Sequence, residues 1–287
     1  MLYAPECGPC LKRQIQEAIE LVGAKGDLAD KITQVTEELF AQQDKFSDGL
    51  EFAAAIHQVI AEIAGSDDVY KELKDASTCQ ALILYPKVKE AIQKQDSPLV
   101  GALKVAAAGN IVDAGAVGLD IPIAEVVHAA VTEPFGRDDS ARLIAELTAA
   151  QSILIIGDNA GETVFDRLLL EIIQEQLGKK DVYYAVKSAP IINDATAEDA
   201  VAAGLDKVAT IFDVGAALPG MVFQRTSREF QRLFAKADVV ISKGQGNFEG
   251  RAGMAHRPVY YLLRVKCGPN ARALKVPPGT QVLVRLP

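Results

Sequence analysis

Carboxylate and amide side chains follow two short apolar runs in the second half of this 287-residue chain. Asp158 and Asn159 come soon after the run 153–156, and Asp194 lies in the segment that follows the run 182–186. Oxygen ligands of this kind suit a hard divalent cation. Two carboxylates at neighbouring strand ends also repel one another unless a cation or a proton lies between them. The pattern favours a metal site, and helix capping by each residue is the alternative.

A glycine-rich turn follows a third apolar run, 239–242, and has the sequence KGQGNFE at 243–249. It does not match a dinucleotide-binding fingerprint, because Glu249 stands where the third glycine belongs. Lys243 followed by Gly244 and Gly246 fits a small phosphate instead, since bare backbone N–H groups can approach the anion and lysine adds a charge. The alternative for Lys243 is a solvated loop lysine.

Two polar residues, Asn110 and Asp113, interrupt an apolar segment in the first half of the chain. Residues three apart share one face of a helix. Polar groups in such a setting need partners, either on a facing helix or in a cleft. The spacing by itself favours a structural role.

The four cysteines are Cys7, Cys10, Cys79 and Cys267. Cys7 and Cys10 form a C-x-x-C pair, which could be half of a zinc site, a redox pair or a structural pair of thiols. A complete zinc site needs further ligands, and no second C-x-x-C or H-x₃₋₅-H supplies them. Cys267 completes a cluster of three thiols only if the two ends of the chain meet in space.

The periodicity of apolar residues changes near residue 150. Residues 1–150 show helical spacing, which predicts a helical bundle or cap domain without a convincing strand. In residues 151–287, apolar runs alternate with helical segments, which predicts a Rossmann-like domain with a mainly parallel sheet flanked by helices. The final strand has no helix before it, so we expect it to pair antiparallel at the edge. Ligands of such α/β sheets bind at the carboxyl ends of the strands.

Composition excludes several classes of protein. The chain is 49% hydrophobic and 24% charged, which argues against disorder. Its net charge of −8 argues against a nucleic-acid-binding protein. Residues 1–150 carry 13 Lys and Arg against 24 Asp and Glu, a net of −11, whereas residues 151–287 carry 17 against 14, a net of +3. Without a secretory signal or a long apolar run, we expect a cytoplasmic protein with no membrane partner.

Five motifs in order along the chain resemble one family. They are ECGPC at 6–10, AAAGNIVD at 106–113, GDNAGE at 157–162, IINDAT at 191–196 and KGQGNFE at 243–249, with the ending VKCGPNARALKVPPG at 265–279. Together they are similar to the metal-dependent damage-control phosphatases, in particular their archaeal and bacterial branch with an N-terminal C-x-x-C. The resemblance covers essentially the whole chain.

This resemblance implies a helical domain above a Rossmann-like α/β domain, with Mn²⁺, Ni²⁺, Co²⁺ or Mg²⁺ bound in the cleft. It implies that Asp158, Asn159 and Asp194 hold the metal, and that the substrate is a small phosphorylated metabolite such as a sugar phosphate. Asn110 and Asp113 would then close the site from the helical domain.

The expected reaction is metal-assisted hydrolysis of a phosphate monoester. The metal would neutralise phosphate charge and lower the pKa of a water molecule. Lys243 and the backbone at 244–246 would hold the phosphoryl oxygens, with Asn247 and Glu162 as further substrate-binding candidates. Asp158 could instead attack phosphorus directly.

Two other classes of function remain open from the residues. One is an S-adenosylmethionine-dependent carboxyl methyltransferase, although Lys187 stands where such enzymes usually place an acidic residue for the ribose hydroxyls. The other is a noncatalytic protein that binds a metal or a phosphometabolite.

Overall fold

The computed structural model describes residues 4–46, 48–108, 129–254 and 256–287. The strands are β1 Arg137–Asp138, β2 Ser152–Ile156, β3 Asp181–Val186, β4 Thr210–Asp213, β5 Val239–Lys243, β6 Val259–Arg264 and β7 Gln281–Leu286. The first α-helices are α1 Cys7–Leu21, α2 Asp27–Phe40, α3 Gly49–Ala64, α4 Lys71–Gln93, α5 Pro98–Ala108 and α8 Ser140–Ala149. The later ones are α9 Thr163–Leu177, α10 Ala197–Ala202, α11 Arg228–Lys236, α12 Gln245–Glu249 and α13 Gly268–Leu274. Short 3-10 helices are η1 Gln43–Lys45, η2 Ala160–Glu162, η3 Leu205–Lys207, η4 Phe223–Arg225 and η5 Arg251–Met254.

The strands form one seven-stranded sheet in the order β1-β7-β6-β5-β2-β3-β4. All neighbouring pairs are parallel except β6 and β7. The chain runs from β2 outward to β3 and β4, then returns to place β5 on the other side of β2. Ligands of open α/β sheets bind where the strand order reverses in this way, so the expected site lies at the carboxyl ends of β2, β3 and β5.

The fold class predicted from periodicity is confirmed: helices precede and flank a mainly parallel sheet. The last strand does pair antiparallel, but the prediction that it forms the edge is wrong, because β1 pairs with it on its outer side. The expectation of no strand before residue 150 is also wrong, because β1 lies at Arg137–Asp138. A two-residue strand is too short to show an alternating pattern.

The sheet separates two apolar cores. Alternate side chains of β2 point to opposite faces, so Ile153 and Ile155 join one core while Leu154 and Ile156 join the other. The first core is closed by α4, α5, α8 and α9, and the second by α11, α12 and α13. Thus α4, α5 and α8 pack with the sheet, although they belong to the residues predicted as a helical domain. The domain boundary at residue 150 itself stays a prediction.

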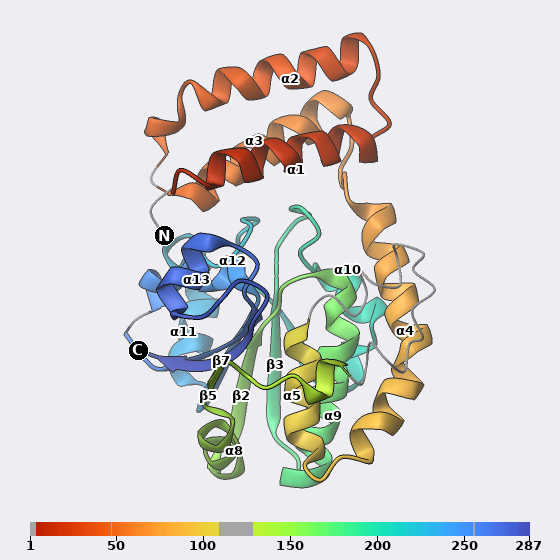
Figure 1. Ribbon diagram of the computed structural model, residues 1–287, viewed down its shortest axis with the longest axis vertical. Coiled ribbons are helices and arrows are strands. Elements are labelled where there is room, and N and C mark those ends of the chain that lie inside the picture. The colour runs from red at the N-terminus through yellow and green to blue at the C-terminus, as the bar shows by residue number, and fades with distance from the viewer. Residues whose placement is uncertain (1–3, 47, 109–128, 255) are drawn as a thin grey trace.

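Helices α1, α2 and α3 form a separate layer with its own apolar core. Ile15, Ile32 and Ile56, one from each helix, are buried in it. This layer lies across one end of the α/β body, and α4 connects the two (Figure 1). The layer is therefore positioned to cover the carboxyl ends of the strands.

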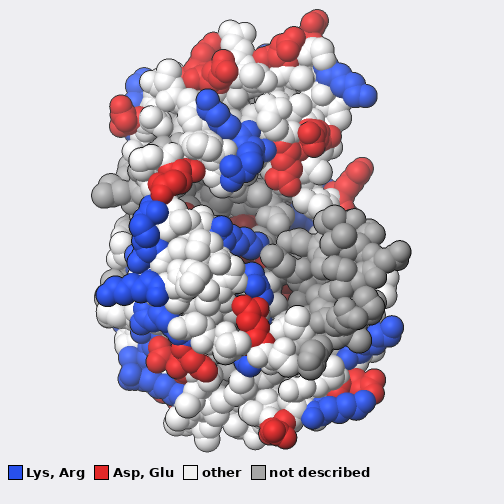
Figure 2. Space-filling view, viewed as in Figure 1, with Lys and Arg blue, Asp and Glu red and all other residues white. Residues whose placement is uncertain are grey.

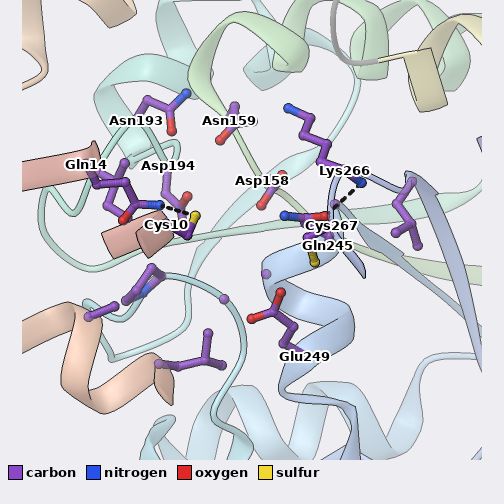
Figure 3. A pocket seen from close by; sticks show the side chains of 18 of the residues that line it. Cys10, Gln14, Asp158, Asn159, Asn193, Asp194, Gln245, Glu249, Lys266 and Cys267 are labelled. Atoms are coloured by element: carbon purple, nitrogen blue, oxygen red, sulfur yellow. Dashed lines mark hydrogen bonds between the residues drawn. The ribbon is translucent and has the colours of Figure 1, made fainter. Parts of the chain in front are cut away.

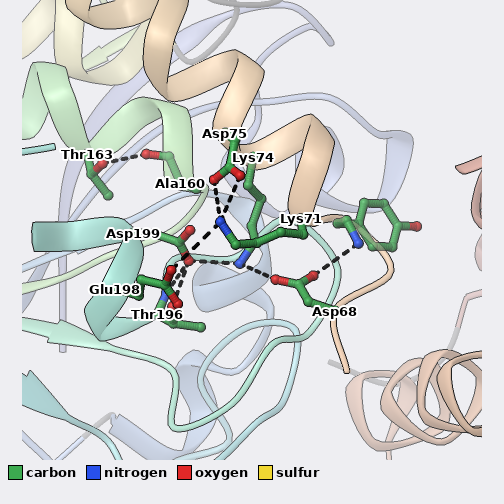
Figure 4. A network of polar contacts seen from close by, with 10 residues as sticks. Asp68, Lys71, Lys74, Asp75, Ala160, Thr163, Thr196, Glu198 and Asp199 are labelled. Carbon is green, nitrogen blue, oxygen red and sulfur yellow. Dashed lines mark hydrogen bonds and ion pairs between the residues drawn. The ribbon is translucent and has the colours of Figure 1, made fainter. Parts of the chain in front are cut away.

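A buried ionic cluster fixes α4 to the α/β body (Figure 4). The ammonium of Lys74, only 2% exposed, lies 2.7 Å from Asp68 Oδ2 and 2.8 Å from Asp199 Oδ2. Asp199 also accepts hydrogen bonds from the main chain and side chain of Thr196, which forms the N-cap of α10. Because Thr196 closely follows Asp194, the cluster connects α4, which carries the α1–α3 layer, to the loop that holds the predicted metal ligand Asp194.

In the described ranges, no helix is both long and apolar enough to cross a bilayer.

Candidate active site

A pocket of about 340 Å³ is lined by residues of the layer formed by α1, α2 and α3, called the cap layer from here on, and by residues at the carboxyl ends of the strands. Figure 2 shows the molecular surface hollowed between these two parts. The lining residues include Asp158, Asn159, Glu162, Asp194, Gly244 and Gly246 from the α/β body, and Cys7, Cys10, Gln14 and Leu50 from the cap layer. Its volume lies at the lower end of the range for small-molecule sites, about 300–1,000 Å³. The pocket thus brings together most of the predicted site residues.

Backbone hydrogen bonds hold the loops after β2 and β3 together. The N–H of Ala195 donates to Asp158 O at 2.8 Å, and the N–H of Ala160 donates to Asn193 O at 2.9 Å. Asn159 and Asp194 form an isolated antiparallel bridge between the same loops. The side chains of Asp158, Asn159 and Asp194 therefore gather at one edge of the sheet, as Figure 3 shows.

Asp158 experiences the repulsion from Asp194 that the sequence predicts. Burial raises the pKa of Asp158 well above its usual value, and the nearby charges of Asp194 and Glu162 add to this rise. Burial also raises the pKa of Asp194, and the Lys187 ammonium opposes that shift. One cation or proton placed between the two carboxylates would relieve both effects.

The donor set fits a divalent cation. Asp194 Oδ2 is buried and, among the described residues, has no hydrogen-bond partner; its nearest cation is Lys187 Nζ at 3.4 Å. Asn159 donates its Nδ2 to Glu162 Oε1 at 3.0 Å, which leaves its carbonyl oxygen for a ligand. No group of three or more His, Cys, Asp or Glu with metal-binding spacing occurs in the described part of the chain. A three-ligand site here therefore depends on the amide of Asn159.

Lys243 lies beneath the pocket and does not line it. Its side chain is 1% exposed, and its ammonium is 2.6 Å from Asp166 Oδ1 and 3.7 Å from Glu162 Oε2. Tyr184 donates its hydroxyl to Asp166 Oδ2 at 2.6 Å. This arrangement supports Glu162 and the start of α9 from below, whereas direct contact of Lys243 with phosphate stays a prediction.

The glycine turn packs tightly around the site. Gly244 has a φ of +74°, and a β-carbon there would overlap the Asp158 carboxylate. Its N–H donates to Leu262 O at 3.2 Å, which occupies that donor. Asn247 is fully buried and donates from Nδ2 to Gly157 O and Lys243 O, both at 2.8 Å. Asn247 therefore connects the loops after β2 and β5, and its predicted contact with substrate stays a prediction.

The two ends of the chain meet at this pocket. Cys7 and Cys10, in the first turn of α1, line it together with Cys267, the N-cap of α13. Arg272 Nη2 lies 2.7 Å from Glu6 Oε1 and joins the same two segments. Burial raises the pKa of both the Cys7 and the Cys267 thiol. The two segments therefore meet, as a cluster of three thiols requires, but within the described residues the cysteines do not form a group of three ligands placed to hold a metal.

Comparison with known proteins identifies the family. The protein-family model described as the damage-control phosphatase ARMT1-like domain matches residues 3–282 of this chain. The chain belongs to the damage-control phosphatase ARMT1-like family.

Two archaeal relatives match over nearly their full length. The chain is 35% identical to the damage-control phosphatase PH1575 of Pyrococcus horikoshii, covering 98% of this chain and 96% of that one. It is 30% identical to a damage-control phosphatase of Archaeoglobus fulgidus, covering 98% of each. The crystal structure of the DUF89 family protein PH1575 superimposes with a TM-score of 0.86, at 32% identity and 100% coverage of both chains. The resemblance inferred from the motifs is thereby confirmed.

Three residues at or beneath the pocket were not among the site residues predicted from the sequence. Asp166 interrupts the apolar face of α9, a signal that could have marked it as a buried partner for a cation. Lys187 is buried and donates to Gly220 O at 2.6 Å, beside Asp194. Lys266 lines the pocket and belongs to the ending VKCGPNARALKVPPG, to which the sequence analysis gave no site role. Asn110 and Asp113 lie outside the described residues, so their predicted role stays a prediction.

Proposed function

We propose that this chain is a metal-dependent phosphatase that hydrolyses monoesters of small phosphorylated metabolites, such as sugar phosphates or damaged phosphometabolites. The observation that carries the proposal is the convergence of Asp158, Asn159 and Asp194 at the strand ends, with one buried carboxylate oxygen left without a hydrogen bond. Membership of a family whose relatives are named damage-control phosphatases supports it.

Asp158, Asn159 and Asp194 would hold Mn²⁺, Ni²⁺, Co²⁺ or Mg²⁺ through oxygen atoms. A divalent ion there supplies electrostatic stabilisation of the phosphate charge. Glu162 orients Asn159 through their hydrogen bond, and Lys187 places a positive charge beside Asp194. The backbone contacts between the loops fix both carboxylates before substrate binds, which is the preorganisation that catalysis by electrostatics requires.

The cap layer supplies the wall that faces the strand ends. Leu11, Leu50 and Ala53 make part of this wall apolar, while Gln14 and the thiols make part of it polar. Such a wall excludes water from the bound organic group and fits a compact metabolite better than a polymer.

A methyltransferase is disfavoured at the end of β3. The acidic residue that such enzymes use for the ribose hydroxyls is replaced by Lys187, whose ammonium is buried and engaged with Gly220 O and Asp194. Specific binding of S-adenosylmethionine without phosphatase activity would reverse this conclusion.

The test is turnover of p-nitrophenyl phosphate by metal-stripped protein and by protein reloaded with Mn²⁺, Co²⁺, Ni²⁺ or Mg²⁺. We expect turnover only after reloading, and losses of about 100-fold or more in Asp158→Ala and Asp194→Ala, because each variant removes a charged ligand. Asp206→Ala, on the exposed side of η3, serves as the matched control. Equal activity in the wild type and both site variants would contradict the proposal.

A further inference from the structure

Gln14 lies on α1, in the cap layer, and its side chain lines the pocket. The side-chain amide is held by His57 of α3, whose Nε2 lies 3.2 Å from Gln14 Oε1. An amide oxygen accepts hydrogen bonds and cannot donate them, so the imidazole donates its Nε2–H to this oxygen. The contact joins two helices of the cap layer and turns the oxygen end of the Gln14 amide toward the interior of that layer.

His57 is itself fixed in place. Its side chain is buried, and it is not among the described residues that line the pocket. Its ring packs edge-on against the ring of Tyr70, with the two centroids 5.8 Å apart. Burial lowers the pKa of His57 to about 4, so the imidazole is neutral at neutral pH and carries one N–H. That single N–H holds the Gln14 amide in one orientation.

The nitrogen end of the Gln14 amide has only a weak partner. Gln14 Nε2 donates to Cys10 Sγ at 3.9 Å, the contact drawn as a dashed line in Figure 3. Sulfur is a weak acceptor, and an amide nitrogen carries two N–H groups. Within the described residues, no oxygen accepts a hydrogen bond from this nitrogen. Because Gln14 and Cys10 both line the pocket, an N–H of the amide is available to a ligand there.

The surroundings of Gln14 limit the kind of ligand group that it can bind. Leu11, Leu50 and Ala53, also from the cap layer, line the same pocket and are apolar. The predicted metal ligands line it from the strand ends. A phosphate monoester held at the strand ends would therefore extend its organic part toward the cap layer. A neutral N–H donor there selects a hydroxyl or carbonyl oxygen, whereas a wholly apolar wall would favour an alkyl chain.

We propose that Gln14 is a specificity-determining residue that donates a hydrogen bond to a hydroxyl or carbonyl oxygen in the organic part of the substrate. His57 is then the positioning residue that orients the Gln14 amide. This inference rests on the proposed function for the phosphoryl end of the ligand. It assigns to the cap layer the selection of oxygen-rich phosphate monoesters over apolar ones of similar size.

The test compares two monoesters of six carbon atoms each, a hexose phosphate and n-hexyl phosphate, and measures the ratio of their kcat/KM values. The protein carries the metal that gives the highest turnover. The hexose phosphate is the one that the wild type hydrolyses fastest among fructose 1-phosphate, fructose 6-phosphate and glucose 6-phosphate. Gln14→Met, which removes the amide but keeps the side-chain length, should lower the ratio by about 3- to 10-fold, the loss of one neutral hydrogen bond. Gln16→Met, the same substitution at an exposed position of α1, is the matched control and should keep the wild-type ratio.

His57→Leu should lower the same ratio by about 2- to 5-fold, because the amide of Gln14 can then turn away from the substrate. The double variant Gln14→Met/His57→Leu should match Gln14→Met alone, since His57 acts on the substrate only through Gln14. A merely structural role of His57 would lower stability and leave the ratio unchanged. Losses that add in the double variant would also contradict the positioning role.

An unchanged ratio in Gln14→Met, or a wild type that prefers n-hexyl phosphate, overturns the inference while the proposed function stands. A wild type that hydrolyses neither ester with any metal contradicts the proposed function instead. Calorimetry on the Mn²⁺-loaded protein then decides the inference, because it measures the Kd values of the two esters without turnover. A ratio of Kd values that shifts in Gln14→Met supports the inference, and an unchanged ratio or no binding of the hexose phosphates overturns it.

Discussion

Gly244 lies so close to Asp158 that a β-carbon at position 244 would overlap the carboxyl group. The contact joins the turn after β5 to the loop after β2, which are 86 residues apart in sequence. The glycine is therefore required by the neighbouring carboxylate as well as by its own backbone conformation.

We expect Gly244→Ala to displace Asp158 and to lower both Mn²⁺ affinity and phosphatase activity by about 10-fold or more, as loss of the support of a metal ligand does. Gly279→Ala is the matched control, because Gly279 also has a positive φ, +90°, but nothing lies within 4 Å of its added β-carbon. That variant should lose about 1–2 kcal/mol of stability from backbone strain and keep full activity. Equal Mn²⁺ affinity in Gly244→Ala and the wild type, measured by titration, would show that the contact does not fix Asp158.

The buried pair of Lys243 and Asp166 predicts a strong effect on stability. Lys243→Met should lower the free energy of unfolding by about 3–5 kcal/mol, because it leaves the Asp166 carboxylate buried without its cation. The double variant Lys243→Met/Asp166→Asn should regain part of that loss, since it removes the unpaired charge. Urea denaturation of the wild type, of Lys243→Met, of Asp166→Asn and of the double variant measures both effects. A double variant as unstable as the sum of its single variants would argue against coupling between the two side chains.

Lys74 and Lys71 offer a matched comparison on one helix (Figure 4). Lys74→Met should cost about 3–5 kcal/mol, because Asp68 and Asp199 would lose a buried cation. Lys71→Met should cost much less, since its contacts with Asp75 and Glu198 are exposed to solvent. Chemical denaturation tests the difference. Similar losses in the two variants would mean that burial does not set the strength of these pairs.

His57 predicts acid sensitivity of the folded state. Burial lowers the pKa of His57 to about 4, against an ordinary value of 6.5. The unfolded chain therefore binds more protons between these two values, so stability is fully present above pH 6.5 and falls as the pH drops toward 4. The loss is about 3 kcal/mol across that range.

His57→Leu should flatten the dependence of unfolding free energy on pH between 6.5 and 4.5, whereas His256→Gln, at an exposed position, should retain it. Urea unfolding across this range is the measurement. A pH profile of His57→Leu that parallels the wild type would assign the acid sensitivity to other groups.

Local pattern was sufficient to predict the strands after residue 150 and the meeting of Asp158 with Asp194, but it missed β1. Both aspartates follow apolar runs, and the carboxyl ends of parallel strands share one edge of a sheet. The helical spacing of apolar residues was also sufficient to predict helices in the segment that forms α1, α2 and α3.

Long-range pairing could not be predicted from local pattern. The sequence predicted that Lys243 binds phosphate, with a solvated loop lysine as the alternative. Neither interpretation includes Asp166, which lies 77 residues earlier and which the fold brings within 2.6 Å of Lys243. Similarly, the place of Lys266 at the pocket depends on the loops after β2 and β3, which bring the acidic residues of the pocket to it. The packing of α5 on the sheet also depends on tertiary contacts, which its almost uniformly apolar sequence does not specify.

The central claim is that Asp158, Asn159 and Asp194 form one metal site. The most direct test is equilibrium titration of the metal-stripped protein with Mn²⁺, with electron paramagnetic resonance used to measure Mn²⁺ binding at each step. We predict one tight site in the wild type, with affinity reduced by about 10- to 100-fold in Asn159→Ala and further still in Asp158→Asn and Asp194→Asn. Mn²⁺ binding that is unchanged in all three variants would contradict the account.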